Sequence, residues 1–359
     1  MAPNFKNVHN RFKLNGYHYT YESLMEVAYS FVKEGVPFEQ AIGEFLLQWL
    51  DYNDFIEVNT SGSTGAPKII KLSKQAMVNS ALATGNFFNL HPGDKALYCL
   101  PTSYIAGKMM LVRAFILGLE IDIIQPTTQL KIDADVNYNF CAMTPMLLEH
   151  NLDKIGNIQT IIVGGAPISN VLKTQIENIS TNIYETYGMT ETVSHIALKK
   201  LNGFSVEEET DNYFKALPNI NISTDERDCL VIEAPHLSEK KVITNDIVKW
   251  HSETEFEWLG RYDNVINSGG VKLFPEQIEA KLQSKINARF FITALPDTSL
   301  GQQVVLVVEQ KNNQINTDIF SVLDKFEKPK TIYNIPIFEE TLSGKVQRQE
   351  TLKKILEKV

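Results

Sequence analysis

The chain has 359 residues, of which 43% are hydrophobic, 21% charged and 10% aromatic. These proportions are those of a globular protein and exclude the disordered, fibrous and disulfide-rich classes. The net charge of −9, from 34 basic and 43 acidic residues with no long Lys/Arg stripe, argues against a nucleic-acid partner.

The first predicted element is helical and covers residues 21–50, where apolar residues recur at spacings of three and four. Beyond it, short β-rich runs alternate with helical segments as far as the strand at 160–163. This alternation predicts a layered α/β domain with a substantially parallel sheet. Between residues 202 and 260, segments such as SVEEE, INIST and CLVIEA are short and turn-rich. They predict a β-rich subdomain.

A different order of elements follows the turn-rich segment RYDNVINSGGVKLFP. We expect a helix from Glu276, the strands FFITALP and QQVVLVVEQ, a helix from Thr317, a further strand and a last helix. This order predicts a compact α+β module. The fold class is therefore α/β, with a large N-terminal domain at 1–262 and a small, mobile α+β domain at 263–359.

The cysteine content and the hydropathy of the sequence indicate in which cellular compartment the protein resides. Cys99, Cys141 and Cys229 are too few and too scattered for a disulfide framework or a CxxC metal site. No apolar stretch reaches the roughly 18 to 20 residues of a membrane-spanning helix, and the N-terminus lacks the apolar core of a secretory signal. We therefore expect a cytoplasmic protein.

A cluster of hydroxyls and glycines follows the predicted strand 54–60 and ends in a lysine. Glycines let backbone amides converge on an anion, while hydroxyls and an ammonium add donors to phosphate oxygens. The residues of this predicted phosphate clamp are Thr60, Ser61, Gly62, Ser63, Thr64, Gly65 and Lys68. A Ser/Gly-rich hairpin turn explains the composition equally well. A Walker A loop is excluded, because an extended run follows where that loop requires a helix.

The segment TSGSTGAPK at 60–68 resembles the phosphate loop of the adenylate-forming superfamily, which includes acyl- and aryl-CoA synthetases, luciferases and peptide-synthetase adenylation domains. Further segments similar to that superfamily's motifs follow in its order, as far as Arg348. The resemblance implies that the chain uses ATP, Mg²⁺ and coenzyme A.

Two of these segments would surround the adenine and the phosphates. GGAP, comprising Gly164, Gly165, Ala166 and Pro167, resembles the backbone that lines one face of the adenine pocket, although an ordinary strand-to-helix turn has the same composition. YETYGMTET at 184–192 is close to the superfamily's YGxTE signature. By this resemblance Tyr187 flanks the adenine, Thr190 contacts the α-phosphate and Glu191 helps to bind Mg²⁺. An aromatic face suits a purine, and a hard cation prefers carboxylate oxygen.

Two further segments would serve the ribose, the hinge and the thiol substrate. In VITNDIVKW, Asp246 matches the aspartate that accepts the ribose hydroxyls, whereas Asn245 replaces the usual glycine. A surface β-turn aspartate is the alternative. In GRYDNVINSGGVKLFPEQIE, the resemblance assigns Arg261 to ribose or phosphate and Asp263 to the hinge. The same segment contains Gly269 and Gly270, which would let the backbone approach the pantetheine arm of coenzyme A.

The last of these segments lies near the C-terminus. TLSGKVQR at 341–348 resembles the superfamily's catalytic-lysine motif, and it makes Lys345 the candidate. A lysine in the first turn of a terminal helix is otherwise usually only solvated. Its assignment depends on the Ser-Gly-Lys context and on the order of the motifs.

Within the superfamily, YGMTETVSHIAL and LPTSYIAGKMMLVRAFILG most resemble the o-succinylbenzoate–CoA ligase family of menaquinone biosynthesis. Arg113 falls where that family has an arginine facing the substrate carboxylate, and its apolar neighbours suggest that it needs an acidic partner. A helix arginine on a solvated face is the alternative. Ser194 and His195 could line the acyl pocket, although His195 could equally be an ordinary hydrogen-bonded core residue.

The chemistry implied by the resemblance has two halves, formation of an acyl-adenylate and displacement of AMP by the thiol of coenzyme A. Two alternatives stay open, activation of a different acid and a non-catalytic nucleotide-binding protein of the same fold. Only about 59 residues precede the phosphate loop, so we expect a shortened N-terminal region.

Overall fold

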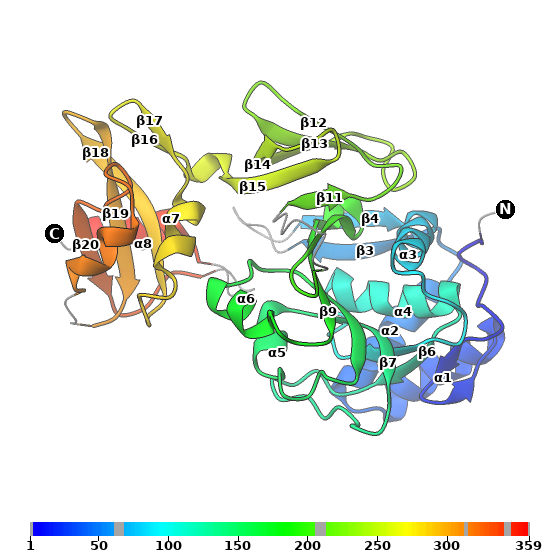
Figure 1. Ribbon diagram of the computed structural model, residues 1–359. Coiled ribbons are helices and arrows are strands. Elements are labelled where there is room, and N and C mark those ends of the chain that lie inside the picture. Colours follow the sequence, from blue (N-terminus) through cyan, green and yellow to red (C-terminus); the bar gives the residue numbers. More distant parts are fainter. Residues whose placement is uncertain (1–2, 61–67, 205–212, 312–314, 341–345, 358–359) are drawn as a thin grey trace.

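The computed structural model describes residues 3–60, 68–204, 213–311, 315–340 and 346–357. In this part of the chain no helix has both the length and the apolar character needed to cross a bilayer. Figure 1 places a large N-terminal part at the right and a smaller group of C-terminal strands and helices at the left.

Thirteen of the described strands form one sheet, in the order β12-β13-β14-β15-β11-β10-β9-β8-β7-β5-β6-β1-β2. Its parallel centre consists of β5 (Lys95–Tyr98), β6 (Glu120–Ile123), β7 (Tyr138–Met143), β8 (Ile158–Val163) and β9 (Asn182–Gly188). At one edge are β1 (Lys13–Leu14), which is parallel to β6, and β2 (Tyr17–His18), which is antiparallel to β1. This is the α/β arrangement with a substantially parallel sheet that the alternation of elements predicts.

The predicted β-rich stretch continues this sheet beyond β10 (His195–Lys200). Its strands are β11 (Phe214–Ala216), β12 (Asn221–Thr224), β13 (Cys229–Glu233), β14 (Val242–Trp250) and β15 (Glu255–Arg261). They pair antiparallel to their neighbours, and β10 pairs directly with β9. The predicted strand SVEEE at 205–209 lies outside the described residues.

Two helices occupy the stretch where the sequence predicts one helical region. They are α1 (Tyr21–Glu34) and α2 (Pro37–Leu50), which pack against each other. The chain leaves the helical conformation at Gly35 and Val36 because Pro37 occupies the first position of α2, and a residue before proline disfavours the helical region.

The strands that flank the glycine-rich segment form a hairpin of their own, made of β3 (Phe55–Thr60) and β4 (Lys68–Ser73). β4 leads into α3 (Lys74–Phe88), where the Ser73 side chain caps the first turn. α3 contacts both β4 and α4 (Ile105–Leu117), and α4 packs on β5 and β6 (Figure 1). The layers are therefore, in order, the β3–β4 hairpin, α3, α4 and the large sheet. α4 is buried from Gly107 to Ile116, a stretch that is apolar except for Lys108 and Arg113.

Two short helices follow parallel strands. α5 (Pro145–Glu149) begins after β7, where the Thr144 hydroxyl caps it, and α6 (Asn170–Ile176) begins after β8 with Ser169 as its cap. Both turns lie at the carboxyl edge of the sheet.

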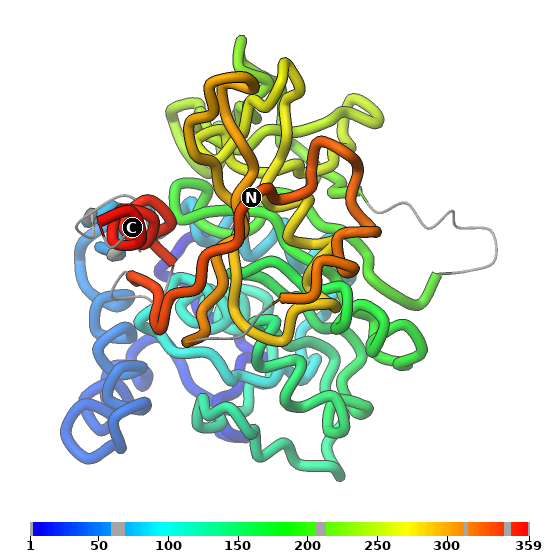
Figure 2. Tube along the Cα trace, turned by 90° about the vertical axis from the view of Figure 1, so that its left-hand side faces the viewer, coloured from blue at the N-terminus to red at the C-terminus, as the bar shows by residue number. Residues whose placement is uncertain are grey.

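The C-terminal part has its own sheet, built from β16 (Ile266–Ser268), β17 (Val271–Leu273), β18 (Phe290–Asp297), β19 (Gly301–Glu309) and β20 (Thr331–Ile335). Its helices are α7 (Pro275–Leu282) and α8 (Arg348–Leu356). The helix expected from Thr317 is a 3₁₀ helix, η3 (Thr317–Val322). Figure 2 looks onto this part, which lies in front of the rest of the chain.

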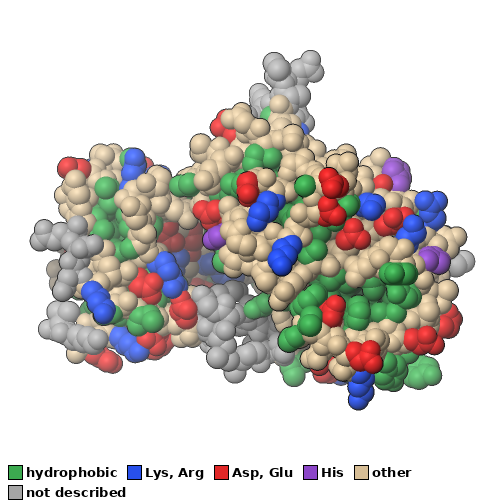
Figure 3. All heavy atoms as spheres, turned by 90° about the horizontal axis from the view of Figure 1, so that it is seen from below, with side chains coloured by type: hydrophobic (Ala, Val, Ile, Leu, Met, Phe, Trp, Pro, Cys, Tyr) green, Lys and Arg blue, Asp and Glu red, His purple; other side chains and the backbone are tan. Residues whose placement is uncertain are grey.

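The buried side chains separate into clusters along the sequence. The main cluster extends from Phe12 to Phe256, whereas two smaller ones contain residues from Ile266 onward. The 3₁₀ turn η2 (Tyr262–Asn264) joins the two sheets. The domain division at 262/263 remains our prediction. On the face shown in Figure 3, acidic and basic side chains of the described residues are interspersed.

Candidate active site

Several predicted site residues lie at the carboxyl ends of β8 and β9, the edge at which parallel sheets usually bind ligands. A Cβ at Gly164 would lie 2.1 Å from the Thr186 hydroxyl, so only glycine lets this loop approach β9. Gly165 has a φ of +88°, which glycine adopts without strain. Ala166 and Pro167 follow as exposed residues. The loop therefore has a conformation that depends on its glycines.

Asp246 brings two other predicted residues and one unpredicted residue together. Its carboxylate accepts hydrogen bonds from the Tyr187 hydroxyl at 2.7 Å, the Trp258 indole at 3.2 Å and the Arg261 guanidinium at 3.4 Å. Burial and the neighbouring Asp246 charge raise the pKa of Tyr187, so Tyr187 stays protonated and donates. The arrangement is a rigid, acidic hydrogen-bond acceptor beside an aromatic ring.

The turn after β9 contains the predicted phosphate and magnesium residues. Thr190 and Glu191 lie in the 3₁₀ turn η1 (Thr190–Thr192), where the Glu191 side chain is exposed. Strand β4 contacts this turn. The strand that follows the glycine-rich segment is thus adjacent to the YGMTE motif, although the two are more than 110 residues apart in sequence.

Val193 reverses the chain immediately after η1. Its φ of +67° and ψ of −52°, with a Ser194 N–H to Thr192 carbonyl bond of 2.7 Å, define a γ-turn of the rare, strained type. A β-branched residue in this conformation costs roughly 1–3 kcal/mol, which the surrounding structure must offset. Gly188 makes the reversal possible, because a Cβ there would lie 2.4 Å from the Ser194 carbonyl oxygen.

The γ-turn directs Ser194 and His195 onto Arg113 of α4. The guanidinium donates to the Ser194 hydroxyl at 2.8 Å and to the Thr84 hydroxyl at 3.2 Å. His195 lies 3.2 Å from the Ser194 hydroxyl and 3.4 Å from that of Thr84. Arg113 is only 2% exposed. The three predicted substrate residues therefore form one cluster in the structure.

Burial governs the charges in this cluster. It lowers the pKa of Arg113 to about 10, which leaves the guanidinium protonated at neutral pH. Burial and the adjacent Arg113 lower the pKa of His195 well below its usual 6.5, which makes the imidazole neutral. No carboxylate within the described ranges lies within ion-pair distance of Arg113, so the acidic partner suggested by its apolar neighbours is not found there.

The remaining described predictions concern the connector and the following hairpin. Asp263 lies in η2 as an exposed residue. Gly269 and Gly270, with φ of +57° and +82°, form the two-residue turn between β16 and β17. Positive φ at both positions is the requirement of a type I′ hairpin, so the turn itself explains both glycines.

Part of the predicted site lies outside the described residues, namely Ser61, Gly62, Ser63, Thr64, Gly65 and Lys345. Thr60 and Lys68 close the hairpin as backbone partners in the register of β3 and β4.

Sequence reasoning missed two residues that the structure places in these clusters. Thr84 lies in the middle of α3, and Trp258 lies in β15. Neither belongs to a motif, and nothing in its neighbourhood of the sequence marks it as a partner of Arg113 or Asp246.

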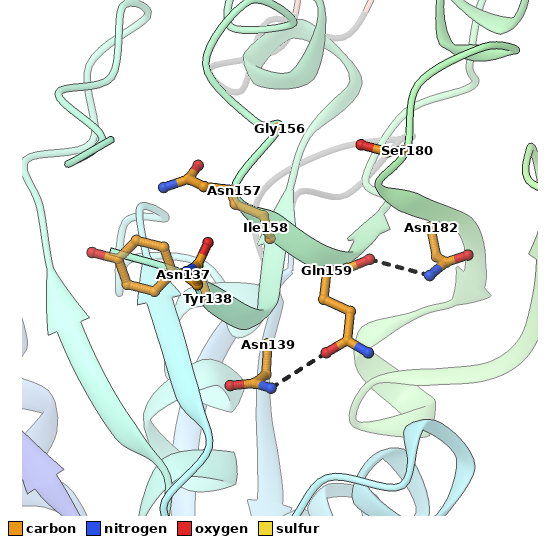
Figure 4. A pocket seen from close by; sticks show the side chains of 9 residues that line it. All are labelled: Asn137, Tyr138, Asn139, Gly156, Asn157, Ile158, Gln159, Ser180 and Asn182. Atoms are coloured by element: carbon orange, nitrogen blue, oxygen red, sulfur yellow. Dashed lines mark hydrogen bonds between the residues drawn. The ribbon is translucent and has the colours of Figure 1, made fainter. Parts of the chain in front are cut away.

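A polar depression of about 280 Å³ lies at the opposite edge of the sheet (Figure 4). Amide side chains at the amino ends of β7, β8 and β9 line it, and Asn139 and Asn182 donate to Gln159 at 3.3 Å. Because the motif residues lie at the carboxyl edge, this depression is not part of the candidate active site.

Comparison with known proteins gives a consistent picture. Residues 58–224 match the AMP-binding enzyme family. A Dyadobacter fermentans structure described as an acyl-CoA synthetase (AMP-forming)/AMP-acid ligase II-like protein is 36% identical, with 92% of this chain and 98% of that chain covered and a TM-score of 0.61.

More distant matches carry a narrower name. The o-succinylbenzoate coenzyme A synthetase of Bacillus subtilis, in complex with ATP and magnesium ion, is 21% identical with a TM-score of 0.70, covering 82% of this chain and 69% of that one. The 2-succinylbenzoate–CoA ligase of Lactococcus lactis is 24% identical over 315 residues, covering 82% of this chain and 69% of the relative.

Proposed function

This chain belongs to the AMP-binding enzyme family, and from that premise we propose that it is an AMP-forming acid–CoA ligase whose acid is o-succinylbenzoate, also called 2-succinylbenzoate. This family agrees with the adenylate-forming superfamily that the sequence motifs resemble. The choice of acid is supported by the names of the more distant relatives and by the chemistry of the Arg113 cluster.

The proposed reaction has two steps. A carboxylate oxygen of the acid attacks the α-phosphorus of ATP, and the bond to the bridging oxygen breaks, which releases pyrophosphate. The sulfur of coenzyme A then attacks the acyl carbonyl, AMP leaves with the bonding electrons, and the thiol proton passes to solvent. Neither step needs a nucleophile from the protein, so catalysis depends on alignment and on stabilisation of developing charge.

The motif residues would supply the nucleotide half of this site. Asp246 would accept the ribose hydroxyls, since it already orients three donors around a carboxylate that is 6% exposed. Tyr187 would pack against the adenine opposite the glycines at 164–165, and Arg261 would contact ribose or phosphate. The glycine-rich segment 60–68 would bind the pyrophosphate end, and Lys345 would stabilise the charge that develops in adenylation.

Glu191 fits the role of a magnesium ligand. Within the described ranges there is no group of three side chains that could bind a metal ion by themselves. Mg²⁺ typically binds one or two carboxylates together with substrate phosphates, so a single exposed glutamate next to a phosphate-binding turn is the donor set expected. The ion would neutralise phosphate charge when bound.

The single observation that carries the choice of acid is the buried guanidinium of Arg113. It is held by two hydroxyls and, among the described residues, has no carboxylate within ion-pair distance. A buried cation without a counter-ion is costly, and a carboxylate on the substrate would supply one. An aromatic acid that carries a second carboxylate satisfies this requirement, whereas a monocarboxylic acid uses its carboxylate in adenylation.

A pyrophosphate-release assay over a panel of carboxylic acids tests the proposal. We expect kcat/KM to be higher for o-succinylbenzoate than for benzoate and simple fatty acids. We also expect the acyl–CoA thioester to form only when coenzyme A is present. Arg113→Ala should lower kcat/KM for o-succinylbenzoate about ten- to a hundredfold, the effect of losing charge-assisted hydrogen bonds. The same substitution should reduce the ratio of kcat/KM for o-succinylbenzoate to kcat/KM for an analogue that lacks the ring carboxylate. Equal activity of wild type on benzoate would contradict the choice of acid.

A further inference from the structure

Four side chains from three elements close a ring of hydrogen bonds around the Arg113 guanidinium. Arg113 on α4 donates from Nε to Thr84 on α3, and from Nη2 to Ser194 after the γ-turn. Ser194 Oγ lies 3.2 Å from Nδ1 of His195, and Nε2 of His195 lies 3.4 Å from Oγ1 of Thr84. Thr84, Arg113 and His195 are buried, so water cannot readily replace these partners.

One bond outside the ring fixes the protons within it. The Thr84 hydroxyl donates to the Ser80 carbonyl at 3.0 Å, so Thr84 can only accept from the ring. It therefore receives the Nε proton of Arg113 and a proton from Nε2 of His195. With that proton on Nε2, the Nδ1 atom of a neutral imidazole must accept, and it accepts from Ser194. Ser194 in turn accepts from Arg113.

The alternative protonation state conflicts with the surroundings. A doubly protonated His195 would place two cations in one buried cluster, facing each other through Ser194 and Thr84. Among the described residues, the groups that face the imidazole are Arg113 from α4, Thr84 from α3 and the adjacent Ser194, none of them acidic. The neutral Nε2–H tautomer is therefore the form that the contacts support.

This pattern of donors and acceptors leaves His195 no nitrogen for a ligand. Both ring nitrogens are engaged within the protein, whereas the guanidinium uses two of its five N–H groups in the ring. The sequence suggests that His195 could line the acyl pocket; the geometry gives it an indirect role instead.

We propose that Thr84 and His195 are positioning residues that fix the plane of the Arg113 guanidinium and thereby hold its remaining N–H groups ready for a carboxylate of the acid substrate. The inference rests on the function proposed above. Preorganisation of this kind matters because a guanidinium recognises a carboxylate through a planar pair of donors, whose geometry fails if the plane rotates.

The first experiment compares Thr84→Val with Thr84→Ser. Valine has nearly the shape of threonine but no acceptor, whereas serine keeps the acceptor and loses only a methyl group. We expect Thr84→Val to raise KM for the acid about tenfold, and Thr84→Ser to restore it to within about threefold of wild type. KM for ATP should stay constant in both, which separates positioning of the acid from a general loss of folding. An unchanged acid KM in Thr84→Val would overturn the inference.

The second experiment observes the ring without any substrate. The chain has seven histidines, so ¹⁵N-histidine labelling gives few signals, and His195→Asn identifies that of His195 by its disappearance. We expect a neutral Nε2–H tautomer that does not titrate between pH 6 and 8, and a mixture of tautomers in Thr84→Val. A His195 that titrates near its ordinary pKa, or that carries its proton on Nδ1, would overturn the ring.

The two experiments also separate this inference from the proposed function. The kinetics use whichever acid of the panel wild type activates best. A preference for another carboxylic acid would contradict the choice of o-succinylbenzoate, while the comparison of Thr84→Val with Thr84→Ser would still decide whether the ring positions Arg113.

Discussion

The side-chain amide of Asn245 donates a hydrogen bond to the Asp263 carboxylate at 3.1 Å, and so joins the end of the large sheet to the connector between the two sheets. The Asn245 oxygen is itself fixed by Arg227, which donates to it at 2.8 Å and lies over the Tyr262 ring. Arg261 lies between Asp246 and Asp263, at 3.4 and 3.9 Å. The proposed ribose site and the connector are therefore parts of one polar network.

The asparagine that replaces the superfamily's usual glycine should restrain the connector. Asn245→Ala removes the hydrogen bond to Asp263 together with the one from Arg227. Because the bond to the connector is worth about 0.5–1.5 kcal/mol, amide exchange at residues 262–265 should become roughly two- to tenfold faster. Asn245→Asp should accelerate it further, because a second carboxylate would face Asp263. Hydrogen-exchange mass spectrometry measures both. Unchanged exchange in Asn245→Asp would show that the contact does not restrain the connector.

How much of the site was predictable depended on whether its residues belong to local motifs. Tyr187, Asp246 and Arg261 were found through motifs, and the structure brings them together even though the first and the last are 74 positions apart in the sequence. Thr84 escaped because its role arises from the packing of α3 on α4, which periodicity does not specify. The γ-turn at Val193 escaped because valine has no propensity for positive φ.

The fold shows the same division. The central parallel strands β5 to β8 were predictable as short β-rich runs, whereas β9 was not, because its sequence NIYETYG contains only one aliphatic residue. The pairing of β9 with β10 was not predictable either, because antiparallel continuation of a sheet has no local signal. For residues 21–50 the prediction of one helical region followed the hydrophobic periodicity and ignored Gly35 and Pro37. These two residues mark the break between α1 and α2.

Asp246 should determine affinity for the nucleotide. Asp246→Asn keeps the size of the side chain but turns an amide toward three donors that need an acceptor. Because hydrogen bonds to charged groups are worth about 1.5–3 kcal/mol, KM for ATP should rise roughly ten- to a hundredfold. Tyr187→Phe removes a single donor and should raise it less, about two- to tenfold. Steady-state kinetics with saturating acid measure both, and a rise confined to the acid KM would contradict the assignment.

Two glycines that look alike in sequence should respond differently to alanine. A Cβ at Gly188 would lie 2.6 Å from Cα of His195, whereas a Cβ at Gly165 would have no neighbour within 4 Å. Gly188→Ala should therefore displace Ser194 and His195, lower the free energy of unfolding by about 1–3 kcal/mol and raise KM for the acid. Gly165→Ala should cost only the strain of its positive φ, about 1–2 kcal/mol, without an effect on the acid KM. Thermal unfolding and steady-state kinetics on both variants test this contrast.

A partly buried ion pair should make the stability of the C-terminal part depend on pH. Arg348, the first residue of α8, donates from Nη2 to Oε2 of Glu279 at 2.9 Å, and its Nη1 lies 2.8 Å from Oε1 as an ion pair. Glu279 also accepts from the Ile292 amide of β18 at 2.7 Å. Burial raises the pKa of Glu279 from 4.5 to about 7, although Arg348 acts in the opposite direction. Between these two values the folded chain binds more protons at Glu279 than the unfolded chain, so its contribution to stability declines as pH rises.

Replacing Arg348 should steepen that decline. Arg348→Gln leaves the Glu279 carboxylate buried without a counter-ion, which raises its folded pKa further and extends the decline above pH 7. Breaking a buried pair in this way costs about 3–5 kcal/mol where the carboxylate is ionised. The loss of protection at the Ile292 amide, measured by hydrogen exchange and corrected for intrinsic rates, should be large at pH 8 and much smaller at pH 5.5, where Glu279 is protonated. In a Glu279→Gln background the difference between the two pH values should largely disappear, because Glu279 can no longer titrate, whereas Glu276, 3.9 Å from Arg348, is present in both backgrounds. A loss in Arg348→Gln that is the same at pH 5.5 and pH 8 would show that Glu279 does not control the stability of this part of the chain.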